Sequence, residues 1–172
     1  WIHTLSMEDF GGESAWIGWK GDDFVIRADR EITAVRGNTI TIDAPLTNAL
    51  DEELSKSIVV NYTWSGRISN VGVENLTLKS DYDTTNPKDE QHRWFAISME
   101  NVKNAWVKQV NFKHFAGGAV TLLKSTQQIT VEDCIASEPI SEIASFRRHT
   151  FYTEGQQTLF QRCYSEYGYH DF

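Results

Sequence analysis

The chain has 172 residues, of which 40% are hydrophobic and 12% aromatic, so it can bury one sizeable core and is not disordered by composition. Its formal net charge of -8 argues against nucleic acid as a partner, because sequence-independent binding to phosphates needs clustered Lys and Arg side chains. No run of about 18 apolar residues occurs, and residues 1–10 lack the basic start and apolar stretch of a signal peptide, so we predict no membrane insertion.

The first third of the chain predicts a β-hairpin. Residues 31–35 and 39–43 alternate apolar and polar side chains, as strands do, and residues 36–38 between them form the turn. Three neighbouring segments complete this region: a short helix at 1–9, a strand at 24–28, and a polar loop or helical turn at 46–54.

Four segments of the remaining chain align with one another. They are 73–78, 107–112, 131–136 and 160–165, spaced by 34, 24 and 29 residues. Three alternating runs precede the last three of these segments, at 96–101, 119–124 and 149–154. Short strands at such a period, with no helical periodicity, predict a parallel solenoid in which each turn of the chain buries its apolar side chains against the next.

The alignment places Cys134 over Cys163. Two cysteines do not make a disulfide framework, and neighbouring side chains at one inward position of parallel strands usually point the same way. We therefore predict a pair of stacked, buried thiols.

The alignment also places short polar residues at a turn of successive strands, where they can bond to the backbone: Asn75, Gln109 and Asp133. Arg162 occupies the fourth position and is expected to interrupt the series.

The chain is predicted to consist of an N-terminal β-rich segment with the hairpin, 1–66, and the stacked strands, 67–172. It has no initiating Met and no capping element at either end. We therefore expect a piece of a longer protein.

Two stretches carry a resemblance to a known family. Residues 37–46, followed by 67–78, resemble the pectate-lyase-like superfamily of right-handed parallel β-helix proteins, and residues 141–172 are similar to uncharacterised bacterial members of it. The resemblance implies an all-β, right-handed parallel β-helix, a hand that parallel crossovers also favour. It further implies a secreted or periplasmic protein that acts on a polysaccharide or oligosaccharide, although a fold alone does not fix a function.

The sequence departs from well-understood members of this superfamily at their catalytic motifs. The Asn-Thr-Asp, Gly-His-Gly and Arg-Ile-Lys strings of polygalacturonases do not occur, and an Asp-Asp pair is found only at residues 22–23, so no catalytic residue is carried over. Neither an EF-hand loop nor the Gly-rich nonapeptide of calcium-binding β-rolls is present. We predict no cofactor and no metal ligand, with Ca²⁺ as the one ion left open.

Stacked strands would bring the connections that follow them to one corner. Long insertions at 80–93 and 137–148 would then form walls around the short turn at 113–118, and four of the five histidines lie in these connections. The candidate catalytic residues are His114, His149, Arg147, Arg148, His170 and Asp171. The candidate substrate-binding residues are Asp81, Asp83, His92, Arg93, Glu142 and Tyr167.

Each candidate group also has a purely structural interpretation. His114 on the shortest turn could be a general base or a corner residue bonded to backbone. Arg147 and Arg148 could bind a uronate carboxylate or form ion pairs with Glu142 or Glu138. Two tryptophans could stack on sugar rings, although aromatic residues in strands are more often buried: Trp94 and Trp106.

Three functions stay open for such a corner. A uronate lyase needs a cation on the carboxylate and a base for the C5 proton. A glycoside hydrolase needs two carboxyls about 5–5.5 Å or 6.5–9.5 Å apart. A glycan-binding or adhesive protein needs neither, and a converging acid and base with strongly displaced pKa values would favour an enzyme over it. The oligomeric state is not predicted.

Overall fold

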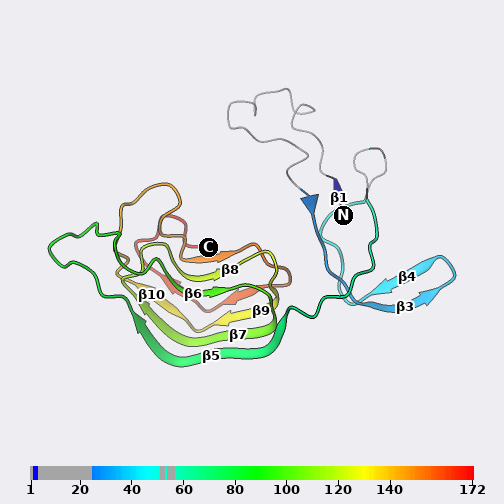
Figure 1. Cartoon of the computed structure of the whole chain (residues 1–172), viewed down its shortest axis with the longest axis horizontal. Coiled ribbons are helices and arrows are strands. Elements are labelled where there is room, and N and C mark those ends of the chain that lie inside the picture. The colour runs from blue at the N-terminus through cyan, green and yellow to red at the C-terminus, as the bar shows by residue number, and fades with distance from the viewer. Residues whose placement is uncertain (1, 4–24, 51–52, 54–56) are drawn as a thin grey trace. The chain divides into compact units, whose positions relative to one another are not determined.

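The computed structural model of the chain describes residues 2–3, 25–50, 53 and 57–172 (Figure 1). The chain divides into two compact units, 1–63 and 64–172. All regular elements of the described residues are strands, which confirms the all-β class, and no helix able to traverse a bilayer is found among them. The short helix expected at 1–9 is wrong for Ile2–His3, which form strand β1, and its other residues lie outside the described part.

The first unit contains two small antiparallel pairs. Strand β1 pairs with β2 (Val25–Ile26), and β3 (Ile32–Arg36) pairs with β4 (Thr39–Ile42). Gly37 in the two-residue turn has a φ of 58°, a left-handed conformation that such hairpin turns require. The predicted hairpin is confirmed, and residues 46–50 form a loop without a helical turn.

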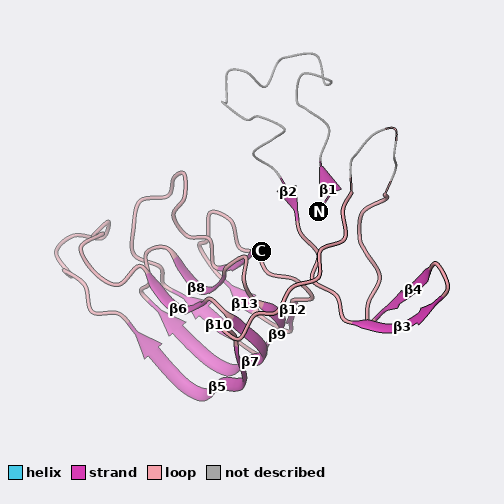
Figure 2. Cartoon of the chain, turned by 45° about the vertical axis from the view of Figure 1, so that its right-hand side comes forward, coloured by secondary structure: helices cyan, strands magenta, loops and turns pink. Residues whose placement is uncertain are grey.

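The second unit consists of two parallel sheets (Figures 1 and 2). The first sheet contains β5 (Ile68–Lys79), β7 (Val102–Lys113), β9 (Gln127–Glu132), β10 (Ile135–Ser137), β12 (Leu159–Gln161) and β13 (Tyr164–Ser165). The second sheet contains β6 (Phe95–Met99), β8 (Gly118–Leu122) and β11 (Phe151–Thr153). The chain passes back and forth between the sheets: β5, β7, the pair β9 and β10, and the pair β12 and β13 lie in the first sheet, and β6, β8 and β11 lie between them in the second.

The register of the first sheet is the predicted one. Val107 pairs with Val73 on one side and Val131 on the other, and Phe160 pairs with Val131. In the second sheet the prediction was wrong by one residue, because Phe151, not Thr150, pairs with Val120. A one-residue shift exchanges the faces of a strand, and the observed register buries the Phe151 ring, which is 3% exposed.

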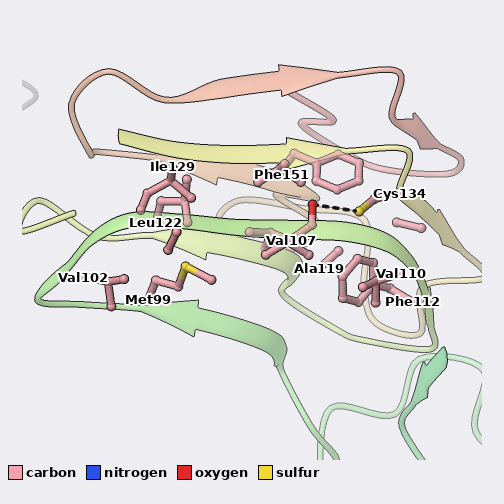
Figure 3. Close-up of a cluster of buried hydrophobic side chains, with 14 residues drawn as sticks. Met99, Val102, Val107, Val110, Phe112, Ala119, Leu122, Ile129, Cys134 and Phe151 are labelled. Atoms are coloured by element: carbon pink, nitrogen blue, oxygen red, sulfur yellow. Dashed lines mark hydrogen bonds between the residues drawn. The ribbon is translucent and has the colours of Figure 1, made fainter. Parts of the chain in front are cut away.

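Apolar side chains from both sheets fill the space between them (Figure 3). Valine, leucine and isoleucine side chains at the centre are fully buried: Val107, Val110, Val120, Leu122, Ile129 and Val131. The alternation of buried and half-exposed residues along β9 shows the period of two that the sequence predicted.

The two cysteines occupy adjacent inward positions. Strand pairing on either side, Glu132 with Gln161 and Ile135 with Tyr164, places Cys134 opposite Cys163. Both are free thiols, as predicted, but only Cys134 is buried and Cys163 is half-buried. Burial raises the pKa of Cys134 to about 11. Cys134 therefore stays protonated at neutral pH and fills the core as a small apolar group.

The first sheet bends at left-handed residues that recur at every fifth position. They form three columns across the strands: Asn70, Asn104, Gln128 and Gln157; Asn75, Gln109, Asp133 and Arg162; and His114, Glu138 and Tyr167. Only Asn and Asp adopt this conformation readily among residues with a side chain. Arg162 was expected to interrupt its column and does not, since it has a φ of 52° and its guanidinium binds the Asp133 carboxylate.

Gln109 offers a test of these bends, because its side chain is exposed and its φ is 53°. Replacing Gln109 with glycine is expected to leave stability unchanged or raise it, whereas valine is expected to lower it by about 1–3 kcal/mol, the cost of a left-handed β-branched residue. Urea unfolding followed by circular dichroism measures both. Asn111→Val, on the exposed face of the same strand, is the control and should be nearly neutral; equal effects at both positions would contradict the strain argument.

Candidate functional site

Four segments follow strands of the first sheet and meet at one side of the second unit: 80–94, 114–117, 138–150 and 166–172, hereafter the corner loops. Pairing of Lys113 with both Lys79 and Ser137 places Ser80, His114 and Glu138 side by side. Backbone hydrogen bonds from Ser80 N to Lys113 O and from His114 N to Ser137 O continue this register into the loops. Residues far apart in sequence therefore share one surface.

The corner carries an open polar hollow beside the end of β5. It is lined by Lys79, Ser80, Asp81, Gln91, His92 and Arg93, which include three of the predicted site residues. The side chains of Lys79, Asp81 and Arg93 are exposed and form no hydrogen bond or ion pair with the described residues. Two cationic groups and one anionic group are thus open to a ligand in the same place.

His92 forms a fixed wall of this hollow. Its Nε2 lies 3.0 Å from Ile140 O and 3.1 Å from Asp89 O, and its Nδ1 lies 2.9 Å from Ser80 Oγ. Carbonyl oxygens only accept hydrogen bonds, so Nε2 is the donor to both of them. Both ring nitrogens are engaged, and the ring joins the loop 80–94 to the loop 138–150.

His114 lies beneath the same surface and is 8% exposed. Its Nδ1 is 3.3 Å from Ser80 O, its Nε2 is 3.3 Å from Glu138 Oε2, and the Tyr82 ring meets it edge-on at 4.8 Å between centroids. Of the two interpretations of His114, a corner residue bonded to the backbone is the one that holds for its Nδ1 atom. The contact with Glu138 adds a charged partner that the sequence did not indicate.

Lys113 completes this group, with its Nζ 2.6 Å from Glu138 Oε1. The hydrogen bond from Lys113, followed by that from His114, holds the pKa of the Glu138 carboxyl below its usual value. Such a carboxylate stabilises the fold above its unfolded pKa, and this contribution is lost as the pH falls through the lower folded pKa.

Lys113→Met should therefore reduce the loss of stability on acidification, because the Glu138 pKa would move back toward its unfolded value. The measurement is urea unfolding of both proteins at about pH 5.5 and about pH 3, the interval in which a paired carboxylate is titrated. Lys124→Met removes the same charge from an exposed turn outside the corner loops. If both variants lose stability with acid as steeply as the parent protein, the ion pair does not contribute.

Arg147 is bound by a carboxylate of the protein itself. Its Nε and NH2 donate to the two oxygens of Glu90, the second at 2.9 Å, and its guanidinium lies over the rings of Trp94 and Phe146. The partners proposed from sequence, Glu142 and Glu138, are wrong. Glu142 instead pairs with Lys88 at 3.0 Å.

Arg148 is buried, at 8% exposure, and bonds only to neutral oxygens. It donates to Ser141 O at 2.7 Å, Ser141 Oγ at 3.1 Å and Tyr167 O at 3.0 Å. Burial lowers the pKa of this guanidinium, which nevertheless stays charged in proteins. Arg148 joins two corner loops, and each of its three nitrogens donates to an oxygen of the protein.

Asp83 and Asp89 organise the turn of the first corner loop. Asp83 accepts from the backbone N and the hydroxyl of Thr85, and these bonds hold its pKa below the usual value. Asp89 is buried and accepts from the backbone N of Asp83 and of Gln91. Asp83, a predicted substrate-binding residue, therefore has one carboxylate oxygen engaged in holding its own turn.

The last corner loop, 166–172, contains three predicted site residues, and their side chains have different surroundings. Asp171 accepts from the hydroxyls of Ser165 and Thr150, whereas the His170 ring meets the His149 ring at 4.5 Å between centroids. Tyr167 is 73% exposed. The two catalytic candidates of this segment, His170 and Asp171, thus have different partners.

The two tryptophans differ. Trp94 is half-buried and stacks on Phe146, with 5.7 Å between centroids. Trp106 is exposed on the outer face of β7, so its expected burial in the core is wrong. A Cβ atom at Gly72 would clash with the Trp106 indole, which shows that the ring lies on this glycine.

Two contributors were missed by the sequence interpretation. Lys79 is the last residue of β5 and lines the hollow. The predicted register already aligned Lys79 with Lys113. No sequence feature indicated that Glu90 binds an arginine, since its partner Arg147 lies 57 residues away. In the described part of the chain, no group of three or more His, Cys, Asp or Glu side chains is placed to hold a metal.

No family model, curated protein or solved structure matches the chain. The chemistry of the corner loops is therefore the basis for assigning a function.

Proposed function

We propose that this chain is a right-handed parallel β-helix that binds a polysaccharide at the corner hollow without cleaving it. The alternation of the chain between two parallel sheets supports a β-helix, and the general preference of parallel crossovers supports its hand. A polymeric glycan ligand also agrees with the secreted or periplasmic location that the family resemblance implies.

The observation that carries the proposal is the set of unpaired polar side chains around the hollow. Lys79 and Arg93 offer donors and Asp81 offers acceptors, and they form no hydrogen bond or ion pair with the described residues. Sugar hydroxyls both donate and accept, so they match such a mixed lining better than an apolar ligand would. The net charge of -8 makes nucleic acid a poor alternative.

The same geometry favours binding over cleavage. At the hollow a lyase would lack a free histidine base, because both nitrogens of His92 and of His114 are already bonded, and His149 and His170 lie outside the hollow. A hydrolase needs a carboxylic acid that donates a proton, yet the pKa values of Asp83 and Glu138 are lowered, which keeps both ionised at neutral pH.

Cleavage is the second candidate, and one contact favours it. His114 Nε2 and Glu138 Oε2, 3.3 Å apart, bring an imidazole and a carboxylate together beside Ser80 of the hollow. Exchange of the Glu138 contact for a substrate would free this nitrogen to act as a base.

The test is calorimetric titration with a panel of acidic and neutral polysaccharides, with reducing ends and absorbance near 235 nm followed in parallel. Arg93→Ala is expected to weaken binding about tenfold, because a charge-assisted hydrogen bond contributes about 1.5–3 kcal/mol. Lys124→Ala removes a charge outside the corner loops and should bind like the parent protein.

Four outcomes separate the candidates. Binding without new reducing ends supports the proposal, and reducing ends formed with the parent protein support cleavage instead. Affinity that is unchanged in Arg93→Ala would remove the hollow as the binding site, and the absence of binding to every glycan in the panel would contradict both candidates.

A further inference from the structure

Two histidines outside the hollow are stacked on adjacent turns of the chain. His149 and His170 form a parallel β-bridge, so they occupy equivalent positions of neighbouring strands. Their rings are 4.5 Å apart between centroids at 67°. His149 is half-buried and His170 is exposed.

The surroundings of His149 leave one of its ring nitrogens with a lone pair that can bind a metal ion. Its Nε2 lies 3.3 Å from Ser145 O, a carbonyl that only accepts, so Nε2 carries the proton in the neutral ring and Nδ1 keeps its lone pair. Metal-binding histidines commonly donate their other ring nitrogen to a backbone carbonyl in this way, which fixes tautomer and ring orientation.

The remaining groups around the pair leave this lone pair and the His170 ring available. The Tyr169 ring packs edge-on against His170 at 4.5 Å, and the Tyr152 ring lies 5.9 Å from His149. The carboxylate of Asp171 is turned to Ser165 and Thr150, and the Tyr152 hydroxyl donates to Glu154. The two cationic side chains that precede His149 are bound elsewhere: Arg147 donates to the Glu90 carboxylate, and Arg148 donates to Ser141 and to Tyr167 O.

We propose that His149 and His170 chelate one divalent transition-metal ion of the borderline class, such as Zn²⁺ or Cu²⁺, whose remaining coordination positions are filled by water. Imidazole nitrogen suits these ions, and for a given site the Irving–Williams order places Cu²⁺ above Zn²⁺. This site does not depend on the polysaccharide proposal, because it uses neither the hollow nor its residues. A bound ion would connect the loop 138–150 to the segment 166–172 through their side chains.

The experiment uses the whole chain after treatment with a chelator. Calorimetric titration with Zn²⁺ is expected to show one ion per chain, with tighter binding of Cu²⁺. His170→Gln and His149→Gln should each weaken binding more than about tenfold, since loss of even an outer-shell partner costs 10–100-fold. His170 is exposed, so its variant is the one expected to fold like the parent protein.

Two matched controls retain the site. Tyr169→Phe keeps the ring beside His170, and Cys163→Ser removes the half-buried thiol as a competing ligand. Both should bind Zn²⁺ like the parent protein, and Cu²⁺ should give an electron paramagnetic resonance spectrum with coupling to two imidazole nitrogens.

Any of three results would overturn the proposal. They are no binding at millimolar Zn²⁺, an unchanged affinity in His170→Gln, or a copper spectrum that keeps two coupled nitrogens in that variant. Loss of binding in Cys163→Ser would likewise assign the ion to the thiols.

Discussion

Phe112→Ala is expected to lower the free energy of unfolding of the unit 64–172 by about 3–5 kcal/mol. The Phe112 ring is 1% exposed and lies in the core between the two sheets. Its removal loses the transfer free energy of the ring and leaves a cavity that close-packed neighbours fill only in part. Urea unfolding monitored by circular dichroism measures the change, and an unaltered m-value would show that it belongs to the native state.

Ile135→Ala is the matched control for this variant. Ile135 is in strand β10, which pairs with β7, but its side chain points outward and is 46% exposed. We expect a loss of less than about 1 kcal/mol, because surface substitutions remove little packing. Similar losses at the two positions would show that the space between the sheets is not the core that stabilises the unit.

Arg148→Ala is expected to lower the free energy of unfolding by about 2–4 kcal/mol. The change removes three hydrogen bonds from a charged donor and leaves buried oxygens of Ser141 without a partner, and each such loss costs about 1–3 kcal/mol. The bond to Tyr167 O is also lost, so hydrogen exchange should become faster in the segment 166–172.

Arg93→Ala provides the comparison for Arg148→Ala. The Arg93 side chain is exposed and its guanidinium forms no hydrogen bond or ion pair with the described residues, so its loss should change stability by less than about 0.5 kcal/mol. Polysaccharide binding should respond in the opposite order, with the large effect at Arg93. A stable Arg148→Ala protein with weakened glycan binding would show that the buried guanidinium acts on the ligand.

Much of the strand pattern could be predicted from the sequence, because apolar and polar residues alternate along the strands with a period of two. Val73, Val107 and Val131 define a register that the structure retains. The one-residue error at Phe151 arose where the chain leaves a loop through Arg148, whose left-handed φ of 55° is not typical of arginine. Arg162 was misjudged for the same reason, since its conformation follows from stacking and from its ion pair with Asp133.

The site was less predictable, because its chemistry depends on which side chains face each other across loops. The sequence could place His114 at the corner but not its contact with Glu138, 24 residues away. Arg147 and Arg148 are adjacent and alike in sequence, yet one is bound by Glu90 and the other is buried among neutral oxygens. Trp106 was expected in the core. Its ring instead lies on Gly72, where a Cβ atom would clash with the indole.

The left-handed columns have a consequence for how such a chain can change during evolution. Left-handed residues recur at every fifth position over 104–114, 128–138 and 157–167, whereas the connections to the second sheet after β7 and after β10, 114–117 and 138–150, differ greatly in length. Insertions and deletions can therefore accumulate in the corner loops without altering the spacing that keeps the bends aligned. A lineage could vary what its corner binds by lengthening or shortening these loops while inheriting the stacked framework intact.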